Sequence, residues 1–203
     1  MGKINRDILK RQLNGALDSR EARDAAFREA NRRFKSEVIK LAEEYDNHPV
    51  TQEIKSGPDA SNRTMTLGGR GNLFTFIGFD EGRGDPTEPV KRMMLTSSTL
   101  HRTRPLIRKM SKGSAEFIFR ASIPSKDDLS IVSRMPWESG RSWVFAIESG
   151  ISGLSHYIYK KFIKGSRSGK AIQTDKKYIT GIVYKPVSYM SSLLSKFRSR
   201  ISL

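Results

Sequence analysis

An apolar stripe at helical spacing between Phe27 and Tyr45 constrains the fold of this chain more than any other feature. Steps of three and four residues place its members on one face of an α-helix: Phe27, Ala30, Phe34, Val38, Leu41 and Tyr45. A less regular set extends the stripe backward: Ile4, Ile8, Leu13 and Leu17. We therefore predict a helix over residues 4–46, which Gly15 breaks or bends. His48–Pro49 ends it, because the residue before a proline avoids the helical conformation.

The stripe is narrow, and the opposite face of this helix carries both signs of charge. Glu29 and Arg33 are spaced for an i,i+4 ion pair. A helix of about 40 residues with so narrow a stripe packs on a neighbouring helix or subunit, or folds back on its own sheet. Both arrangements stay open at this point. We take residues 1–48 as a long helical arm and residues 49–203 as an α+β core domain.

The core domain alternates loops with short apolar runs. Loops are predicted at 55–72 and 80–89, short helices at 88–98 and 125–134, and a C-terminal amphipathic helix from Pro186. Strands are predicted at 99–109, 115–123, 143–148 and 178–184, and the run 73–79 suits a strand or an insertion into a partner. In 115–123, apolar residues from Ala115 to Ile123 alternate with Glu116, Arg120 and Ser122. The fold class is therefore α+β, with a small antiparallel or mixed sheet.

Positive charge is concentrated in the last quarter of the chain. The net charge is +16, and residues 148–203 hold 11 Lys/Arg against 2 Asp/Glu. Such an excess calls for a negatively charged neighbour, whether nucleic acid, an acidic protein surface or anionic lipid. Its densest part is a Gly-rich basic loop at about 160–177, which contains Phe162 and is followed by Tyr178. This loop either follows phosphates without reading sequence or contacts another subunit.

The chemical motifs in the sequence are weak. GSRSGKA at 165–171 lacks the spacing of a phosphate-binding loop, and Ala171 stands where a magnesium-holding hydroxyl is needed. The histidines lie in three separate segments, at His48, His101 and His156, and the chain has no cysteine. Asp127 and Asp128 suit the start of a helix better than a catalytic pair. We therefore expect no catalytic residue, metal, cofactor or membrane span.

Two blocks of sequence resemble the neck and tail-completion proteins of long-tailed, contractile-tailed bacteriophages. The first block is residues 50–86, VTQEIKSGPDASNRTMTLGGRGNLFTFIGFDEGRGDP. The second is PWESGRSWVFAIESGISGLSHYIYKKF at 136–162, followed by SRSGKAIQ at 166–173. The resemblance implies a structural virion protein without an active site. It is one of about six subunits in a head–tail connector, tail-completion or tail-terminator ring, whose partners are other copies, neighbouring neck or tail-tube proteins, and the DNA in the channel.

The resemblance also implies two sets of contact residues. Those that would meet DNA or an acidic partner are Lys160, Lys161, Lys164, Arg167, Lys170, Lys176 and Lys177. Those that would form the subunit interface are Leu73, Phe74, Phe76, Phe79, Trp143, Ile151 and Leu154, with Arg141 shaping a turn beside them. The alternative is a protein that binds nucleic acid without sequence specificity.

Overall fold

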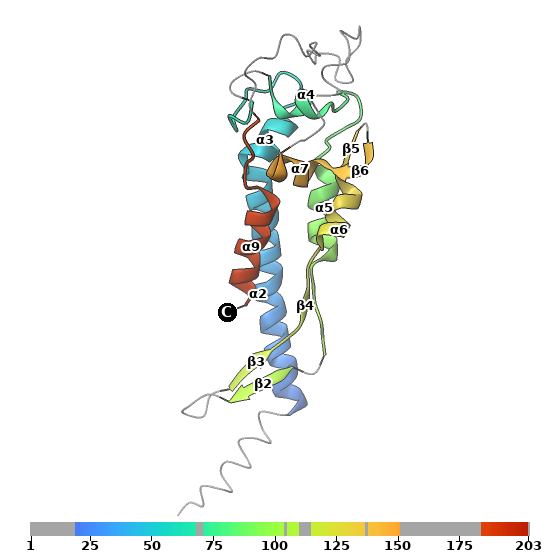
Figure 1. Ribbon diagram of the computed structural model, residues 1–203. Coiled ribbons are helices and arrows are strands. Elements are labelled where there is room, and N and C mark those ends of the chain that lie inside the picture. The colour runs from blue at the N-terminus through green and yellow to red at the C-terminus, as the bar shows by residue number, and fades with distance from the viewer. Residues whose placement is uncertain are drawn as a thin grey trace, which may run out of the picture.

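The computed structural model describes residues 19–67, 71–103, 105–109, 115–136, 138–150 and 184–202. In this part of the chain, seven helices and three two-stranded antiparallel sheets form an elongated molecule (Figure 1). The elements are α2 (Arg20–Asn47), α3 (Pro49–Lys55), α4 (Leu73–Ile77), α5 (Glu88–Ser97), β1 (Thr99–Leu100), β2 (Leu106–Lys109), β3 (Ala115–Ile118), β4 (Ala121–Ser122), α6 (Lys126–Val132), β5 (Arg134–Met135), β6 (Glu138–Ser142), α7 (Trp143–Ser149) and α9 (Met190–Ile201). The predicted α+β fold, with a long N-terminal helix and a C-terminal helix, is confirmed. None of the helices in these ranges combines the length and the apolar character that a bilayer span requires.

Helix α2 forms the long axis of the molecule. Its first turn is capped by Ser19, whose hydroxyl accepts a hydrogen bond from the backbone N–H of Ala22 at 3.1 Å. It ends at Asn47, before the predicted His48–Pro49 boundary. Four members of the predicted stripe are buried: Phe34, Val38, Leu41 and Tyr45. The part of the predicted helix before residue 19 lies outside the described residues.

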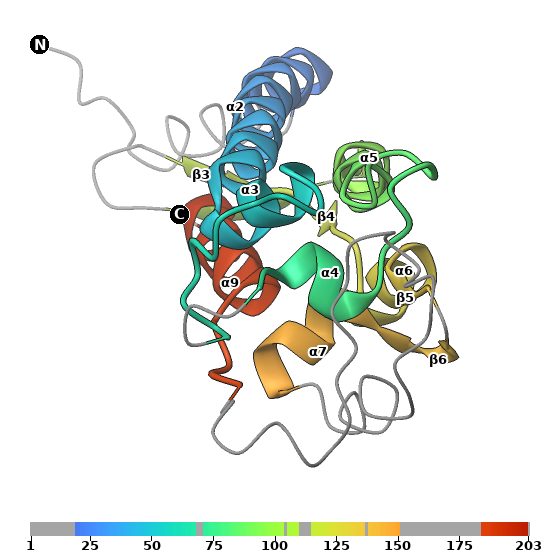
Figure 2. The same cartoon turned by 90° about the horizontal axis from the view of Figure 1, so that it is seen from above.

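The buried stripe of α2 packs on other helices of its own chain. Helices α9 and α5 lie beside it (Figures 1 and 2), and the rings of Phe34 and Phe197 are 6.0 Å apart. The Arg200 guanidinium reaches from α9 to α2, with Nε 2.5 Å from Glu37 Oε2 and Nη1 3.0 Å from Glu44 Oε1. The C-terminal half of the predicted arm therefore belongs to the core that it forms with residues after 48.

Aromatic residues from distant parts of the sequence meet at the C-terminal end of α2. Tyr189, just before α9, is fully buried and stacks on Tyr45 and Trp143, with ring centroids 5.8 and 6.4 Å away. Its hydroxyl lies 2.6 Å from Thr51 Oγ1. Burial raises the pKa of Tyr189, so the phenol stays neutral and keeps this hydrogen bond. The contacts join α2, α3, α7 and the chain before α9 into one core.

Two segments predicted as strands, 73–79 and 143–148, are helices. Helix α4 is capped by Asn72, whose Oδ1 accepts from the N–H of Thr75 at 2.9 Å, and it ends at Gly78 with φ +85°. Helix α7 is capped by Ser142, whose Oγ accepts from the N–H of Phe145 at 3.4 Å. The prediction was wrong because an apolar run this short does not show a period that separates a strand from a helix.

The predicted helices after residue 80 are present. Helix α5 has Pro89 in its first turn, and α6 begins with a capping box between Ser125 and Asp128. Helix α9 starts at Met190, later than the predicted Pro186. Glu148 of α7 caps the start of this helix: its Oε1 accepts hydrogen bonds from the N–H of Tyr189 at 3.0 Å and from the N–H of Ser191 at 2.6 Å. Residues 178–183 of the last predicted strand lie outside the described part.

The predicted strands 99–109 and 115–123 are present in shorter pieces. Strand β1 pairs with β4 and β2 pairs with β3, all antiparallel. Between the two ladders the regular pairing stops, although the N–H of His101 still donates to the carbonyl of Arg120 at 2.8 Å. The resulting ribbon leaves α5 and α6 and runs beside α2 toward its Arg20 end (Figure 1). The β2–β3 hairpin therefore lies far from the aromatic core.

Candidate interaction surface

The β2–β3 hairpin is the most exposed apolar feature among the described residues. Its register pairs Leu106 with Ile118 and Ile107 with Phe117. Cross-strand partners share one face of a sheet, and both members of the first pair are exposed, Leu106 at 70 % and Ile118 at 36 %. Ile107 and Phe117, on the other face, are half-buried. Two paired aliphatic side chains thus face solvent at the far end of the molecule.

Both outer edges of this hairpin lack a strand partner among the described residues. Strand β2 pairs only with β3, and β3 only with β2, in that part of the chain. An edge with unpaired N–H and C=O groups is a template for an added strand. The hairpin is therefore suited to non-covalent association through its backbone and its apolar face.

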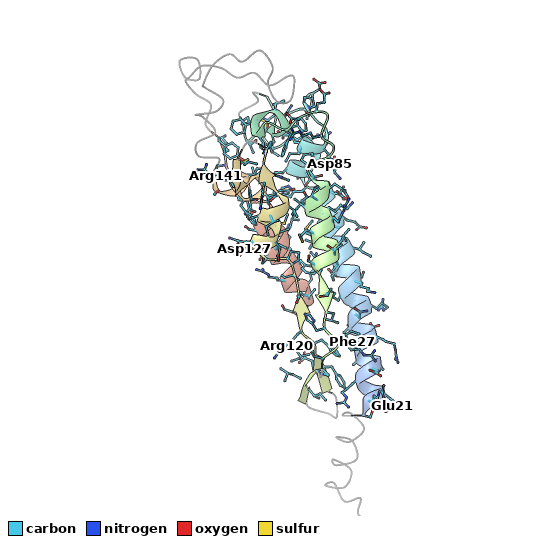
Figure 3. The ribbon with its side chains drawn as sticks, turned by 90° about the vertical axis from the view of Figure 1, so that its right-hand side faces the viewer. Glu21, Phe27, Asp85, Arg120, Asp127 and Arg141 are labelled. Atoms are coloured by element: carbon cyan, nitrogen blue, oxygen red, sulfur yellow. The ribbon has the colours of Figure 1, made fainter. Side chains whose placement is uncertain are left out.

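A small cluster holds the ribbon against α2 just before the hairpin. The rings of Phe27 and Phe119 meet edge to face at 5.5 Å, and the Arg102 guanidinium lies 5.8 Å from the Phe27 centroid. Arg102 Nη2 also donates to Asp24 Oδ1 at 2.8 Å, a hydrogen bond that lowers the pKa of Asp24. Figure 3 shows Phe27 on α2 at the level of Arg120 on the ribbon. We call Asp24, Phe27, Arg102 and Phe119 the latch.

A buried carboxylate organises the loop at the opposite end of the molecule. Glu53 is fully buried. Its Oε2 accepts from the N–H and the hydroxyl of Thr64, at 2.8 and 2.9 Å, and its Oε1 accepts from the N–H of Leu73 at 2.8 Å. Glu53 thus ties α3 to the loop after it and to the first turn of α4. Met65, next to Thr64, is 60 % exposed in the left-handed region with φ +56°.

The described residues of the predicted subunit interface lie in the core of a single chain. Leu73, Phe74, Phe79 and Trp143 are at most 6 % exposed, and Phe76 is half-buried with its ring stacked on that of Tyr184 at 5.6 Å. Buried side chains have no surface to offer another subunit. In this structure they stabilise the fold, and the exposed apolar pair of the hairpin is the better candidate for an interface.

The rest of the predicted contact set falls outside the described residues. This applies to the interface residues Ile151 and Leu154 and to all seven basic positions: Lys160, Lys161, Lys164, Arg167, Lys170, Lys176 and Lys177. Arg141 is described, on β6 near the end opposite the hairpin (Figure 3). These contacts remain predictions.

The described polar residues that were weighed for catalysis have structural roles. His101 Nε2 lies 2.6 Å from Ser122 Oγ across the β1–β4 ladder. Asp128 accepts hydrogen bonds from the Ser125 backbone and hydroxyl, which lower the pKa of Asp128. Burial lowers the pKa of His48, whose Nδ1 accepts from the N–H of Val50 at 3.3 Å. Within the described ranges no group of three His, Asp or Glu side chains could hold a metal ion.

Comparisons with known proteins identify no relative for this chain. No family model matches it, and neither the curated proteins nor the solved structures searched gave a match. Its function must therefore be argued from its own residues.

Sequence analysis missed the exposed pair of the hairpin, although one signal was present. In the predicted strand 115–123, Ile118 occupies a position between Glu116 and Arg120, on the polar face of the alternation. An aliphatic residue at such a position predicts an exposed side chain on an otherwise polar face. Leu106 has no such local signal, and its exposure follows only from its register opposite Ile118.

Proposed function

We propose that this chain is a structural subunit of a bacteriophage neck, assembled with other copies into a ring that joins the head or connector to the tail tube. The observation that carries the proposal is the β2–β3 hairpin, which lies away from the core with an exposed Leu106–Ile118 pair and with outer edges that no other described strand pairs with. A chain with such a feature gains stability by association. Its chemistry is assembly rather than catalysis.

Two further features support the same function. The sequence blocks at 50–86 and 136–173 resemble neck and tail-completion proteins. The net charge of +16, concentrated after residue 148, suits a ring through which DNA passes or whose neighbours are acidic. The proposed location is the virion, and the proposed partners are other copies in a hexameric ring, adjacent neck or tail-tube proteins, and genomic DNA.

Electron microscopy of phage particles made with and without the gene tests this function. We expect the chain in purified virions, with antibody label at the junction of head and tail. Without the gene, heads and tails should accumulate unjoined. Virions that lack the chain, or that assemble normally without it, contradict the proposal.

The net charge also supports a second candidate, a protein that binds nucleic acid without sequence specificity. That function expects duplex binding that weakens with salt, with a log–log slope of about −0.9 for each phosphate neutralised. Fluorescence anisotropy with a labelled duplex over a salt series measures this slope. Affinity that does not change with salt removes this candidate.

A further inference from the structure

The β2–β3 hairpin has two different outer edges, and the register within the chain indicates what each edge can accept. Strand β2 pairs antiparallel with β3 so that Leu106 lies opposite Ile118 and Arg108 opposite Glu116. The β3 edge of one copy can therefore accept the β2 edge of another copy with the same residues opposite one another. The compatibility of these two strands is already demonstrated by the ladder inside each chain.

The apolar pair gives the same pairing a continuous surface. In a sheet of strands β2, β3, β2 and β3 from two copies, the two Leu106–Ile118 pairs fall on one face in a single row. Exposed at 70 % and 36 % in one chain, these side chains would gain neighbours from the next copy. Burial of aliphatic side chains favours association.

We infer that the hairpin joins copies of this chain head to tail, with the β3 edge of one copy pairing with the β2 edge of the next. Because each copy uses two different edges, the contact is heterologous and generates a ring when the rotation closes. The inference rests on the proposed function, since it names the contact by which the ring subunits meet. The latch keeps each hairpin beside its own α2 while the edges stay available.

Cysteine cross-linking tests the pairing directly, because the chain has no native cysteine. Leu106→Cys and Ile118→Cys are made as separate full-length variants and oxidised alone and mixed. Head-to-tail pairing expects disulfide-linked dimers chiefly in the mixture, since residues opposite each other on paired strands have Cβ atoms about 4.5–5.5 Å apart. Symmetric pairing expects dimers of one variant alone.

The matched control uses Ile39→Cys on α2, a residue that is 56 % exposed and far from the hairpin. Its mixture with Ile118→Cys should remain monomeric on a non-reducing gel. Equal cross-linking in every mixture, cross-linking of single variants only, or no cross-linking at all overturns the inference. The last result is also what a hairpin that accepts a strand from a different protein would give.

Sedimentation of surface variants gives an independent measurement. Leu106→Asp places a charge in the proposed contact, and Ile39→Asp makes a similar change on an exposed part of α2. We expect the first to raise the apparent dissociation constant of self-association about tenfold or more, and the second to leave it unchanged. Rings that persist with Leu106→Asp refute this contact but not the neck function, whereas virions without the chain refute the function itself.

Discussion

Replacement of Glu53 by glutamine changes one buried group and leaves its size almost unaltered. Both carboxylate oxygens accept hydrogen bonds: Oε1 from the N–H of Leu73, and Oε2 from the N–H and hydroxyl of Thr64. A glutamine amide has only one oxygen. In either orientation its NH₂ group faces a backbone N–H donor, of Thr64 or of Leu73, so Glu53→Gln must leave one backbone donor unpaired.

The orientation that places the amide oxygen toward Thr64 costs least, because it keeps two of the three hydrogen bonds. The remaining loss is the bond to Leu73, a residue that is fully buried. An unsatisfied buried donor costs about 1–3 kcal/mol, and hydrogen bonds to a charged acceptor are stronger than those to an amide. We therefore expect Glu53→Gln to lower the free energy of unfolding by about 2–4 kcal/mol.

Urea unfolding of the full chain, followed by tryptophan fluorescence and far-ultraviolet circular dichroism, measures this loss. Thr64→Val is the matched control, because it keeps the backbone bond to Glu53, removes only the hydroxyl with its contacts to Glu53, Asn62 and Thr66, and should cost about 1 kcal/mol. A Glu53→Gln variant within about 0.5 kcal/mol of the native chain would refute the reasoning. It would mean that the hydrogen bond to Leu73 and the negative charge of the acceptor contribute no net stability.

Four further predictions concern the latch, the start of α9 and the contact between α9 and α2. Arg102→Gln removes the ion pair of the latch, so hydrogen exchange in the hairpin should accelerate while the unfolding midpoint stays near the native value. The pKa of Asp24 is lowered in the folded chain, so the latch should be intact at neutral pH and lost as the pH falls through that lowered value. Hydrogen-exchange rates of the hairpin across an acid series measure this loss, and protection that is unchanged in acid would contradict the prediction. Glu148→Gln weakens the cap that the N–H of Ser191 requires at the start of α9 and should cost about 0.5–2 kcal/mol in urea unfolding, with no change in the denaturant slope. Arg200→Met leaves the carboxylates of α2 without their cation and should destabilise by about 1–3 kcal/mol, an effect that disappears on acidification if its cause is electrostatic.

Prediction from sequence succeeded where the local signal and the tertiary environment agreed. The stripe of α2 has enough turns for its period to be read, and Phe34 and Leu41 are buried as it indicates. The capping box of α6 depends on Ser125 and Asp128 alone, three residues apart, so it is readable without any distant contact. The partner of the α2 stripe was left open, and it is chiefly α9, more than 140 residues later in the chain.

The burial of the described interface residues could not be read from the sequence, for a different reason. Leu73, Phe74, Phe79 and Trp143 are large apolar residues, and the sequence does not distinguish a side chain that packs inside its own chain from one that packs on a neighbour. Their burial is decided by Tyr189 and other residues brought from far along the chain. The hairpin pair is exposed because the ribbon carries it away from that core.

By itself, the sequence determined the α+β class, the end of the long helix before His48–Pro49, the starts of α5 and α6, and the excess of positive charge. These follow from periodicity, capping and composition, which act over a few residues or over the whole chain at once. Only the tertiary structure decided that residues 73–77 and 143–149 are helices and that Leu106 and Ile118 face solvent. A run of five to seven apolar residues fits either a strand or a helix, and exposure depends on which distant segments happen to cover it.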